Sequence, residues 1–240
     1  MKKLLILFAL ALPFTACEDI ETVLNDTGLS NDDVVKGLKS ALEISTDTSV
    51  NILNAVDGYY KDDVVKILLP PEAAIIFDNI AKIPGGRQLV DQTIMAINRS
   101  AEDAAIEAKP IFVNAITSMS FDDAFGILNG HDSSATEYLH GKTYNDLVSA
   151  FSPKISASLS KPLVAGTSAE SLYQSLVGQY NQVANLSLGL LKPITQNTLG
   201  EYTTTKALDG LFIKVTDEEA KIRTNVSHRV NDILKKVFGS

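Results

Sequence analysis

The sequence has little of the side-chain chemistry from which catalytic and metal sites are built. Its 240 residues include a single cysteine, Cys17, so the chain forms no internal disulfide, and the rest of it offers no thiol nucleophile or zinc-thiolate site. Three histidines exclude a histidine-rich metal site, and four scattered arginines disfavour a phosphate-binding cluster. Tryptophan is absent and aromatic residues make up 7%, which weighs against a surface that stacks on sugars.

The usual motifs of enzymes and cofactor-binding proteins are missing as well. The chain has no Gly-x-Ser-x-Gly, no His-Glu-x-x-His, no phosphate-binding loop and no dinucleotide glycine pattern. Its formal charge of −8 becomes −10 when residues 1–16, with two lysines and no acid, are removed to leave 240 − 16 = 224 residues. This charge argues against nucleic acid and anionic lipid surfaces as partners. We therefore predict no cofactor, no bound metal and no catalytic residue.

Residues 1–16 are organised as a signal peptide. Two lysines precede nine unbroken apolar residues, Leu4 to Leu12, which are too few to span about 30 Å of hydrocarbon as a helix. Small residues then lead into Cys17 as in the bacterial lipobox, with the departure that Phe14 stands where leucine is usual. We predict cleavage before Cys17 and acylation of its thiol. The alternative is an ordinary signal peptide that is cut after Ala16.

An acylated Cys17 would attach the chain to a membrane. Two or three acyl chains, at about 0.8 kcal/mol per buried methylene, hold a protein there without a basic patch. The following residues are acidic and carry little pattern, so we expect a lipidated tether over 17–28 and a folded domain over 29–240. This organisation predicts a lipid-anchored protein of the bacterial cell envelope. We favour the outer membrane over the inner, and the periplasmic or surface face stays open.

From residue 29 onward the helical period dominates. Ser30-Asn-Asp-Asp33 and Ser120-Phe-Asp-Asp123 are capping boxes, each followed by apolar residues at helical spacing. The clearest core helix covers about 87–108, where apolar residues recur at intervals of 4, 3, 4, 3 and 4 from Val90 onward. The sequence predicts an all-α single domain of about eight to ten helices. Only Lys61 to Leu69 is accepted as a possible extended segment.

Further helix starts are predicted in the second half of the chain. Thr143-Tyr-Asn-Asp146 and Thr216-Asp-Glu-Glu219 have the spacing of N-terminal caps, and Thr167-Ser-Ala-Glu170 has it too. Ser152-Pro153 fits an N-cap followed by a proline at the first helical position, which predicts a kink or a fresh helix there.

Several segments resemble, in the same order, those of a known bacterial family. The most specific are Ala207-Leu-Asp-Gly-Leu-Phe212, Glu218-Glu-Ala-Lys-Ile-Arg223 and Ile233-Leu-Lys-Lys-Val-Phe-Gly239. Together with Asp123-Ala-Phe-Gly-Ile-Leu-Asn-Gly130 they resemble the family catalogued as domain of unknown function 4197, over about 29–240. One departure is Val226, where the resemblance leads us to expect proline. The resemblance implies a helical domain of the cell envelope and supplies no catalytic residue.

One group of polar residues surrounds a predicted turn in the middle of the chain. Its members are Asp122, Asp123, His131, Asp132 and His140. If helix 121–129 folds back on helix 133–140, these carboxylates and imidazoles converge, and such a cluster binds zinc or supplies an acid and a base. In the alternative, which we favour, the acids only stabilise a first helical turn and a turn after Gly130.

Asn98 and Arg223 pose the same choice. As a pair they could contact a ligand, or Asn98 could tie helices together while Arg223 pairs with Glu219 four residues earlier. We favour the structural roles. For Tyr59-Tyr60 and Phe77 we likewise favour a place in the core over contact with the membrane or with a lipid.

Three functions fit this sequence. The favoured one is a non-enzymatic interaction or ligand-binding module with an unknown protein or apolar small-molecule partner, because a tether keeps local partners at high effective concentration. A carrier of an apolar ligand or lipid requires a closed apolar cavity of several hundred Å³. A hydrolase requires Asp123, Asp132 and a histidine within about 8 Å of one another.

Overall fold

The computed structural model describes residues 30–195 and 198–238, and it is all-α over these ranges, as predicted. They form nine α-helices and three short 3₁₀ helices, with no strand. The predicted signal peptide, Cys17 and the tether lie outside the described residues. The α-helices are α2 (Asn31–Asn54), α3 (Ile75–Asn79), α4 (Gly86–Ala105), α5 (Ala108–Thr117), α6 (Phe121–Leu128), α7 (Ser134–Leu159), α8 (Ala169–Leu186), α9 (Gly200–Thr224) and α10 (Asp232–Phe238), and the 3₁₀ helices are η1 (Pro71–Ala73), η2 (Ile80–Lys82) and η3 (Val226–His228).

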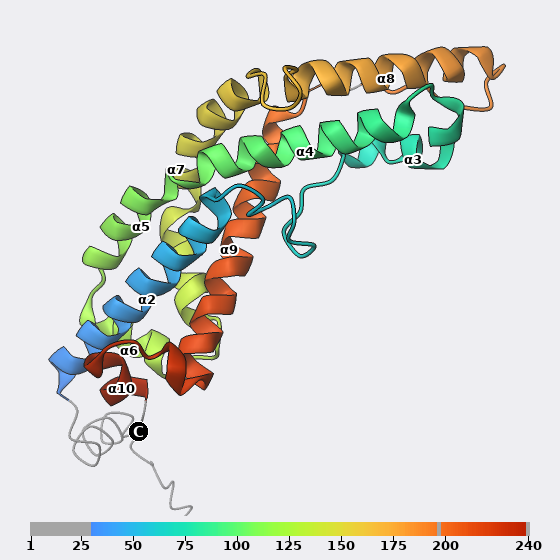
Figure 1. Ribbon diagram of the computed structural model, residues 1–240. Coiled ribbons are helices and arrows are strands. Elements are labelled where there is room, and N and C mark those ends of the chain that lie inside the picture. The colour runs from blue at the N-terminus through green and yellow to red at the C-terminus, as the bar shows by residue number, and fades with distance from the viewer. Residues whose placement is uncertain (1–29, 196–197, 239–240) are drawn as a thin grey trace, which may run out of the picture.

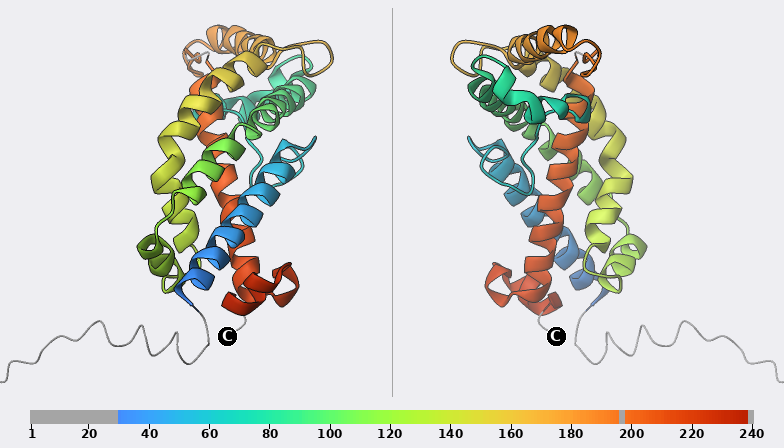
Figure 2. Two further views of the ribbon diagram at one scale, coloured as in Figure 1. Left: turned by 90° about the vertical axis from the view of Figure 1, so that its left-hand side faces the viewer. Right: turned by 90° about the vertical axis from the view of Figure 1, so that its right-hand side faces the viewer.

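The helices form an elongated bundle with an arm at one end (Figure 1). In the bundle α9 packs against α2 and α7, while α6 and α10 lie at the end where α2 begins. The arm consists of α4 and α8, which pack against each other, together with the short α3. Figure 2 shows that α9 runs along nearly the whole length of the molecule. This helix therefore connects the bundle to the arm.

The predicted core helix is present as α4. Its buried residues include Val90, Ile94, Ile97, Ala101 and Ala104, which is the spacing that the sequence predicted. The small alanine side chains allow neighbouring helices to approach closely. On this face α4 contacts α2, α7, α8 and α9.

Both serine capping boxes are confirmed. At the start of α2 the Ser30 hydroxyl accepts a hydrogen bond from the Asp33 amide at 3.1 Å, and the Asp33 carboxylate accepts one from the Ser30 amide at 3.1 Å. Ser120 and Asp123 repeat this arrangement at the start of α6 with the same distances. Each box satisfies helix amides that have no partner within the helix.

Two of the three predicted threonine caps lie inside helices, and the third is displaced by one residue: the helix expected at Thr167 is present as α8, but its N-cap is Ser168. Thr143 lies inside α7 and its hydroxyl donates to the carbonyl of Leu139 at 2.7 Å, while Thr216 lies inside α9 and donates to the carbonyl of Phe212 at 2.9 Å. Each hydroxyl bonds to the preceding turn of its own helix and so does not start a new one.

Of the kink or fresh helix predicted at Ser152-Pro153, the fresh helix is absent, because α7 continues through Pro153 to Leu159. Its buried side chains Leu147, Phe151 and Ile155 form one stripe on both sides of the proline. We attribute the continuity to the packing of this stripe, which offsets the cost of about 3 kcal/mol for a proline inside a helix.

The segment between α2 and α4 contains little α-helix. Residues 61–65 are mostly turns, and Lys66 to Leu69, the rest of the possible extended segment, lies outside any helix. Residues 71–82 are divided into η1, α3 and η2. Within the described part of the chain no single helix is long and apolar enough to cross a membrane, although α5 and α6, bent by 102°, pass that test together on length and composition.

Candidate functional site

A groove runs along one side of α9, between this helix and the segment that precedes α3. Its larger part has a volume of about 350 Å³ and its smaller part about 240 Å³, and the two share Tyr202 and Lys206. We call the whole the α9 groove. Its residues are Val64 to Leu68, Pro70 to Glu72, Tyr173, Thr198, Glu201, Tyr202, Thr205, Lys206, Asp209, Gly210 and Ile213.

The helical period of α9 places the groove residues on one face. Tyr202, Lys206, Asp209 and Ile213 follow at intervals of 4, 3 and 4, which keeps them on the same side of a helix. Residues such as Leu211 between them are buried in the core. One face of α9 thus forms the wall of the groove while another packs into the bundle.

Gly210 allows the opposite wall to approach α9. A side-chain carbon at this position would lie 2.9 Å from the Tyr59 ring and 3.2 Å from the Val65 side chain. Tyr59 is fully buried and its hydroxyl donates to the carbonyl of Ala207 at 2.8 Å. The turn that carries Tyr59 therefore lies directly on the helix backbone, and this tyrosine belongs to the core.

Asn98 holds the extended segment against α4. Its side-chain oxygen accepts a hydrogen bond from the Ile67 amide at 2.9 Å, and its side-chain nitrogen donates to the carbonyls of Ile67 and Ile94, both at 2.7 Å. The side chain is fully buried, so these bonds are shielded from water. These three hydrogen bonds give the Asn98 side-chain amide a structural role and hold one wall of the groove in place.

A second buried contact holds the turn after α2. The Glu102 carboxylate accepts hydrogen bonds from the amides of Tyr59 and Tyr60, both at 3.2 Å, and pairs with Arg99 at 2.6 Å. Arg99 also pairs with Asp57 at 2.6 Å, and Asp57 has a left-handed backbone with φ of 73°. The hydrogen bond from Lys61 and then that from Arg99 lower the pKa of the Asp57 carboxyl.

The polar side chains of the groove form hydrogen bonds and ion pairs with their neighbours. Tyr202 donates to the carbonyl of Leu69 at 3.3 Å, and Lys206 pairs with Asp209 at 2.9 Å. Burial, and then the nearby carboxylates of Glu72 and Glu170, raise the pKa of Tyr173 to about 12. Its phenol is therefore neutral at physiological pH. Phenol and carboxylate groups beside apolar side chains make a surface of mixed character, suited to binding.

The predicted polar cluster is divided among separate contacts. Helix α6 does pack against α7, which was the condition for the polar side chains of the cluster to converge. Asp123, however, is engaged in its capping box, where the hydrogen bonds from Ser120 lower its carboxyl pKa. His131 contacts the Ser133 hydroxyl at 3.0 Å and the Glu137 carboxylate at 3.5 Å.

The remaining members of the cluster are exposed. Asp122 and Asp132 lie at the surface. His140 stacks on Tyr144 with ring centroids 4.8 Å apart and makes a tilted contact with Phe212 at 4.7 Å. Across residues 30–195 and 198–238 no three His, Cys, Asp or Glu side chains are placed to hold a metal ion.

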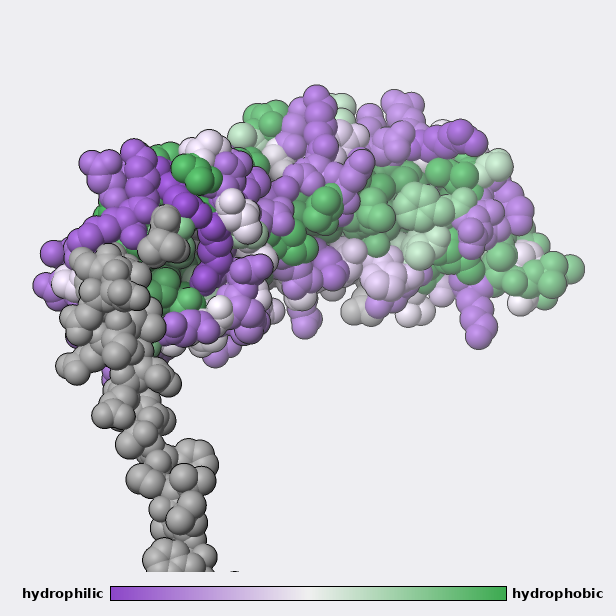
Figure 3. All heavy atoms as spheres, turned by 90° about the horizontal axis from the view of Figure 1, so that it is seen from below, coloured by the Kyte–Doolittle hydropathy of each residue, from purple (hydrophilic) through white to green (hydrophobic). Residues whose placement is uncertain are grey.

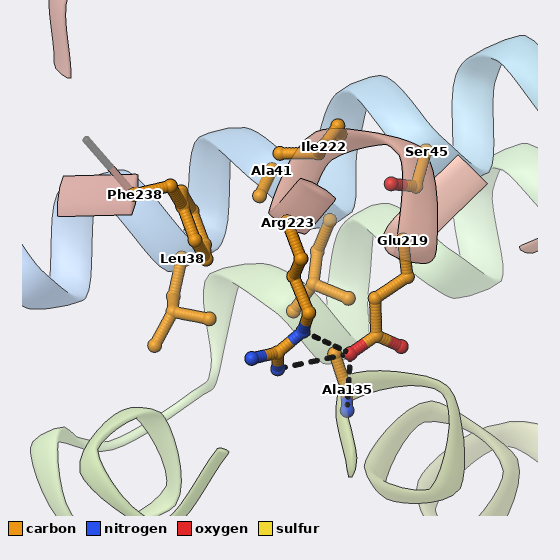
Figure 4. A pocket seen from close by; sticks show the side chains of 9 residues that line it. Leu38, Ala41, Ser45, Ala135, Glu219, Ile222, Arg223 and Phe238 are labelled. Carbon is orange, nitrogen blue, oxygen red and sulfur yellow. Dashed lines mark hydrogen bonds and ion pairs between the residues drawn. The ribbon is translucent and has the colours of Figure 1, made fainter. Parts of the chain in front are cut away.

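Arg223 and Glu219 lie at the other end of α9, beside a small apolar pocket (Figure 4). The buried Glu219 carboxylate accepts from the amides of Ala135 and Thr136 at 3.1 and 2.9 Å and pairs with Arg223 at 3.0 Å. Glu219 thus caps the start of α7, and not a new helix at Thr216 as its spacing suggested. The pocket has a volume of about 10 Å³, close to that of one water-sized probe.

Comparison with known proteins identifies one family. A model described as "Protein of unknown function (DUF4197)" matches residues 28–239, which is most of the chain. No curated protein matches the sequence, and no solved structure does.

Proposed function

We propose that this chain, which belongs to the DUF4197 family of proteins of unknown function, is a lipid-anchored, non-enzymatic interaction module of the bacterial cell envelope. In this proposal the α9 groove binds a segment of a partner protein. The supporting observation is the groove itself: two connected hollows of about 350 and 240 Å³ beside an irregular segment that buried hydrogen bonds hold in place.

The shape and lining of the groove favour a peptide over a lipid. Both parts are open to solvent and combine apolar side chains such as Val64 with the hydroxyl of Tyr202 and the charges of Glu201 and Lys206. An acyl chain requires an enclosed apolar cavity, and the apolar pocket beside Phe238 holds only about 10 Å³. The carrier alternative therefore gains no support from these hollows.

The hydrolase alternative lacks a common site for its members. Asp123 is hydrogen-bonded to Ser120 and His131 to Ser133, while His140 contacts the rings of Tyr144 and Phe212. A general acid and base must both reach one substrate atom directly or through one water. These separate contacts favour the structural roles of the cluster.

The envelope location in this proposal depends on the sequence around Cys17. The signal-peptide pattern and the single cysteine support an acylated N-terminus. The described chain begins beside α6 and α10, at the opposite end of the molecule from the arm (Figure 1). A tether at that end would leave the α9 groove free to meet a partner.

Site-specific photo-crosslinking of the lipidated protein in intact cells tests this proposal. A crosslinking amino acid at Thr205 probes the larger part of the groove, and one at Ile213, in a second experiment, probes the smaller part. We expect both positions to yield adducts of the same mass. Asn145, exposed on α7, serves as the control and should yield none. No adduct from the groove, or the same adduct from Asn145, would contradict a partner at this site.

A further inference from the structure

The loop after α8 presents the most exposed apolar side chains of the described chain. Leu186, Leu188 and Leu190 are 84%, 98% and 88% exposed, more than any other large hydrophobic residue in residues 30–195 and 198–238. Scattered exposed leucines are ordinary in proteins, but three within five residues of one loop form a patch that marks an interaction site. We call Leu186 to Leu190 the leucine loop.

Polar contacts hold this loop in place without its leucine side chains. The Leu190 amide donates to the carbonyl of Ser187 at 3.2 Å, and the Leu191 amide to its hydroxyl at 2.9 Å. On the far side of the loop, Tyr180 donates to the carbonyl of Lys192 at 3.1 Å. Leu188 itself has a left-handed backbone with φ of 55°. The loop is thus a fixed turn with leucines projecting outward, and folding gains little from those side chains.

The loop lies in a part of the chain without acids. Between Glu170 and Glu201 there is no Asp or Glu, and Lys192 is the single charged residue. The whole chain, by contrast, has 29 acids and a net charge of −8. The segment that contains the loop therefore has no carboxylate. Insertion of the leucines into an apolar phase would not carry the cost of removing water from a carboxylate of this segment.

The loop forms the tip of the arm, far from the start of α2. In Figure 1 it lies at the free end of α8, and Figure 3 shows hydrophobic residues gathered toward the same end of the molecule. Helix α3 lies at this end and carries Phe77, which is 41% exposed, so its predicted place in the core is wrong. The start of the described chain and the leucine loop therefore lie at opposite ends of the molecule.

We propose that the leucine loop inserts into a phospholipid bilayer, as a membrane contact separate from the acylated Cys17 and independent of the α9 groove. Aliphatic side chains on a projecting turn match the acyl region of a bilayer, which needs no complementary surface. Protein-binding hot spots are instead rich in Trp, Tyr and Arg and poor in leucine. The net negative charge of the protein repels anionic lipid head groups, and the apolar contact needs no charged lipid. The bilayer in this proposal is therefore zwitterionic.

Fluorescence quenching by lipid tests this inference. A genetically encoded environment-sensitive fluorophore replaces Leu188 in the lipidated protein, which is reconstituted into phosphatidylcholine vesicles. In one arrangement the vesicles that hold the protein contain phosphatidylcholine with brominated acyl chains, which quench fluorescence. In the other arrangement only added protein-free vesicles contain the brominated lipid. We expect the fluorophore at position 188 to lose about half of its emission in one of the two arrangements, and high salt should not change this loss. A fluorophore at Asn145 on α7 is the matched control and should keep its emission.

Each outcome of this experiment has one meaning. Quenching within the same vesicles shows that the arm lies along the membrane of the anchor, and quenching by added vesicles shows that it reaches a second membrane; both support insertion. If neither lipid quenches position 188, the inference is wrong and the leucines remain for a protein partner. In a Leu186→Ser/Leu190→Ser variant quenching should fall to the control level, with an unchanged melting temperature because these side chains are exposed.

Discussion

At the scale of single residues, the buried polar side chains of this protein hold irregular backbone in place. Asn98 bonds the extended segment, Glu102 the turn after α2, and Glu219 the first turn of α7. The sequence singled out Asn98 because an amide at the edge of an apolar stripe is unusual. For Glu219 the sequence predicted only the ion pair with Arg223, which the structure confirms, and for Glu102 it predicted nothing. The backbone amides that these glutamates bind lie in distant segments and leave no trace in a helical pattern.

Replacing Asn98 with alanine should strongly destabilise the fold. The substitution leaves the amide and carbonyl of Ile67 buried without partners, and each such group costs about 1–3 kcal/mol. We expect a loss of about 3 kcal/mol in the free energy of unfolding, measured by urea denaturation. Asn145→Ala, at an exposed position of α7, is the control and should change it by less than about 0.5 kcal/mol. Equal effects of the two substitutions would mean that Ile67 is not held by Asn98.

The Asp57 carboxylate should make stability depend on acid pH. Lys61 and Arg99 lower its pKa below the ordinary value of 3.8, so its contribution is complete above pH 3.8 and is lost as the pH falls toward the folded pKa. Asp57→Asn removes this titration, and asparagine tolerates the left-handed backbone found there. Urea denaturation at pH 7 and about pH 3 should show a smaller acid-induced loss in the variant than in the unaltered protein. If the variant loses as much unfolding free energy in acid as the unaltered protein does, these ion pairs do not lower the pKa of the Asp57 carboxyl.

At the scale of secondary structure, the sequence identified most helices but not all of their ends. Ser30 and Ser120 begin helices, whereas Thr143 and Thr216, with similar spacing to an acid, lie inside them. Buried positions continue at helical spacing on both sides of each threonine, as Leu139 and Leu147 do around Thr143. Packing therefore joins the two predicted helices, and each threonine hydroxyl bonds to the previous turn. Local spacing alone cannot reveal such packing.

The α9 groove was not predicted, because its walls come from segments about 130 residues apart in the sequence. One signal for it does exist: Gly210 interrupts the side chains of α9 where the turn carrying Tyr59 approaches. In a helix interior a glycine costs up to about 1 kcal/mol relative to alanine. Its presence therefore indicates close contact with another segment.

Gly210→Ala should move the turn away from α9. The added carbon would lie 2.9 Å from the Tyr59 ring, a distance that requires the neighbours to shift. We expect a loss of about 1–3 kcal/mol in unfolding free energy despite the better helix propensity of alanine. Gly141→Ala in α7 is the matched control: no atom lies within 4 Å of the new carbon, so it should stabilise by about 0.5–1 kcal/mol. Stabilisation by both substitutions, in thermal and urea unfolding, would contradict a tight contact at Gly210.

At the scale of the whole molecule, two separate features are strongly apolar. One is the segment that precedes Cys17 in the sequence, and the other is the leucine loop at the tip of the arm. The sequence predicted the first from its order of charged, apolar and small residues. It could not predict the second, because Leu186, Leu188 and Leu190 continue the apolar pattern of α8 and look like core residues until the fold leaves them exposed.

In our proposals the acyl group on Cys17 and the leucine loop contribute separately to membrane association, and Cys17→Ala separates the two contributions. When the mature chain is secreted behind the signal peptide of a non-lipidated protein, the substitution should release most of it into the aqueous compartment, because two or three acyl chains bind far more strongly than one apolar loop. The leucine loop should retain a minor fraction on membranes after a high-salt wash. Adding Leu186→Ser, Leu188→Ser and Leu190→Ser should remove this fraction, as measured by fractionation and immunoblotting. If Cys17→Ala alone leaves the bulk of the protein membrane-bound, the acyl group is not its main anchor.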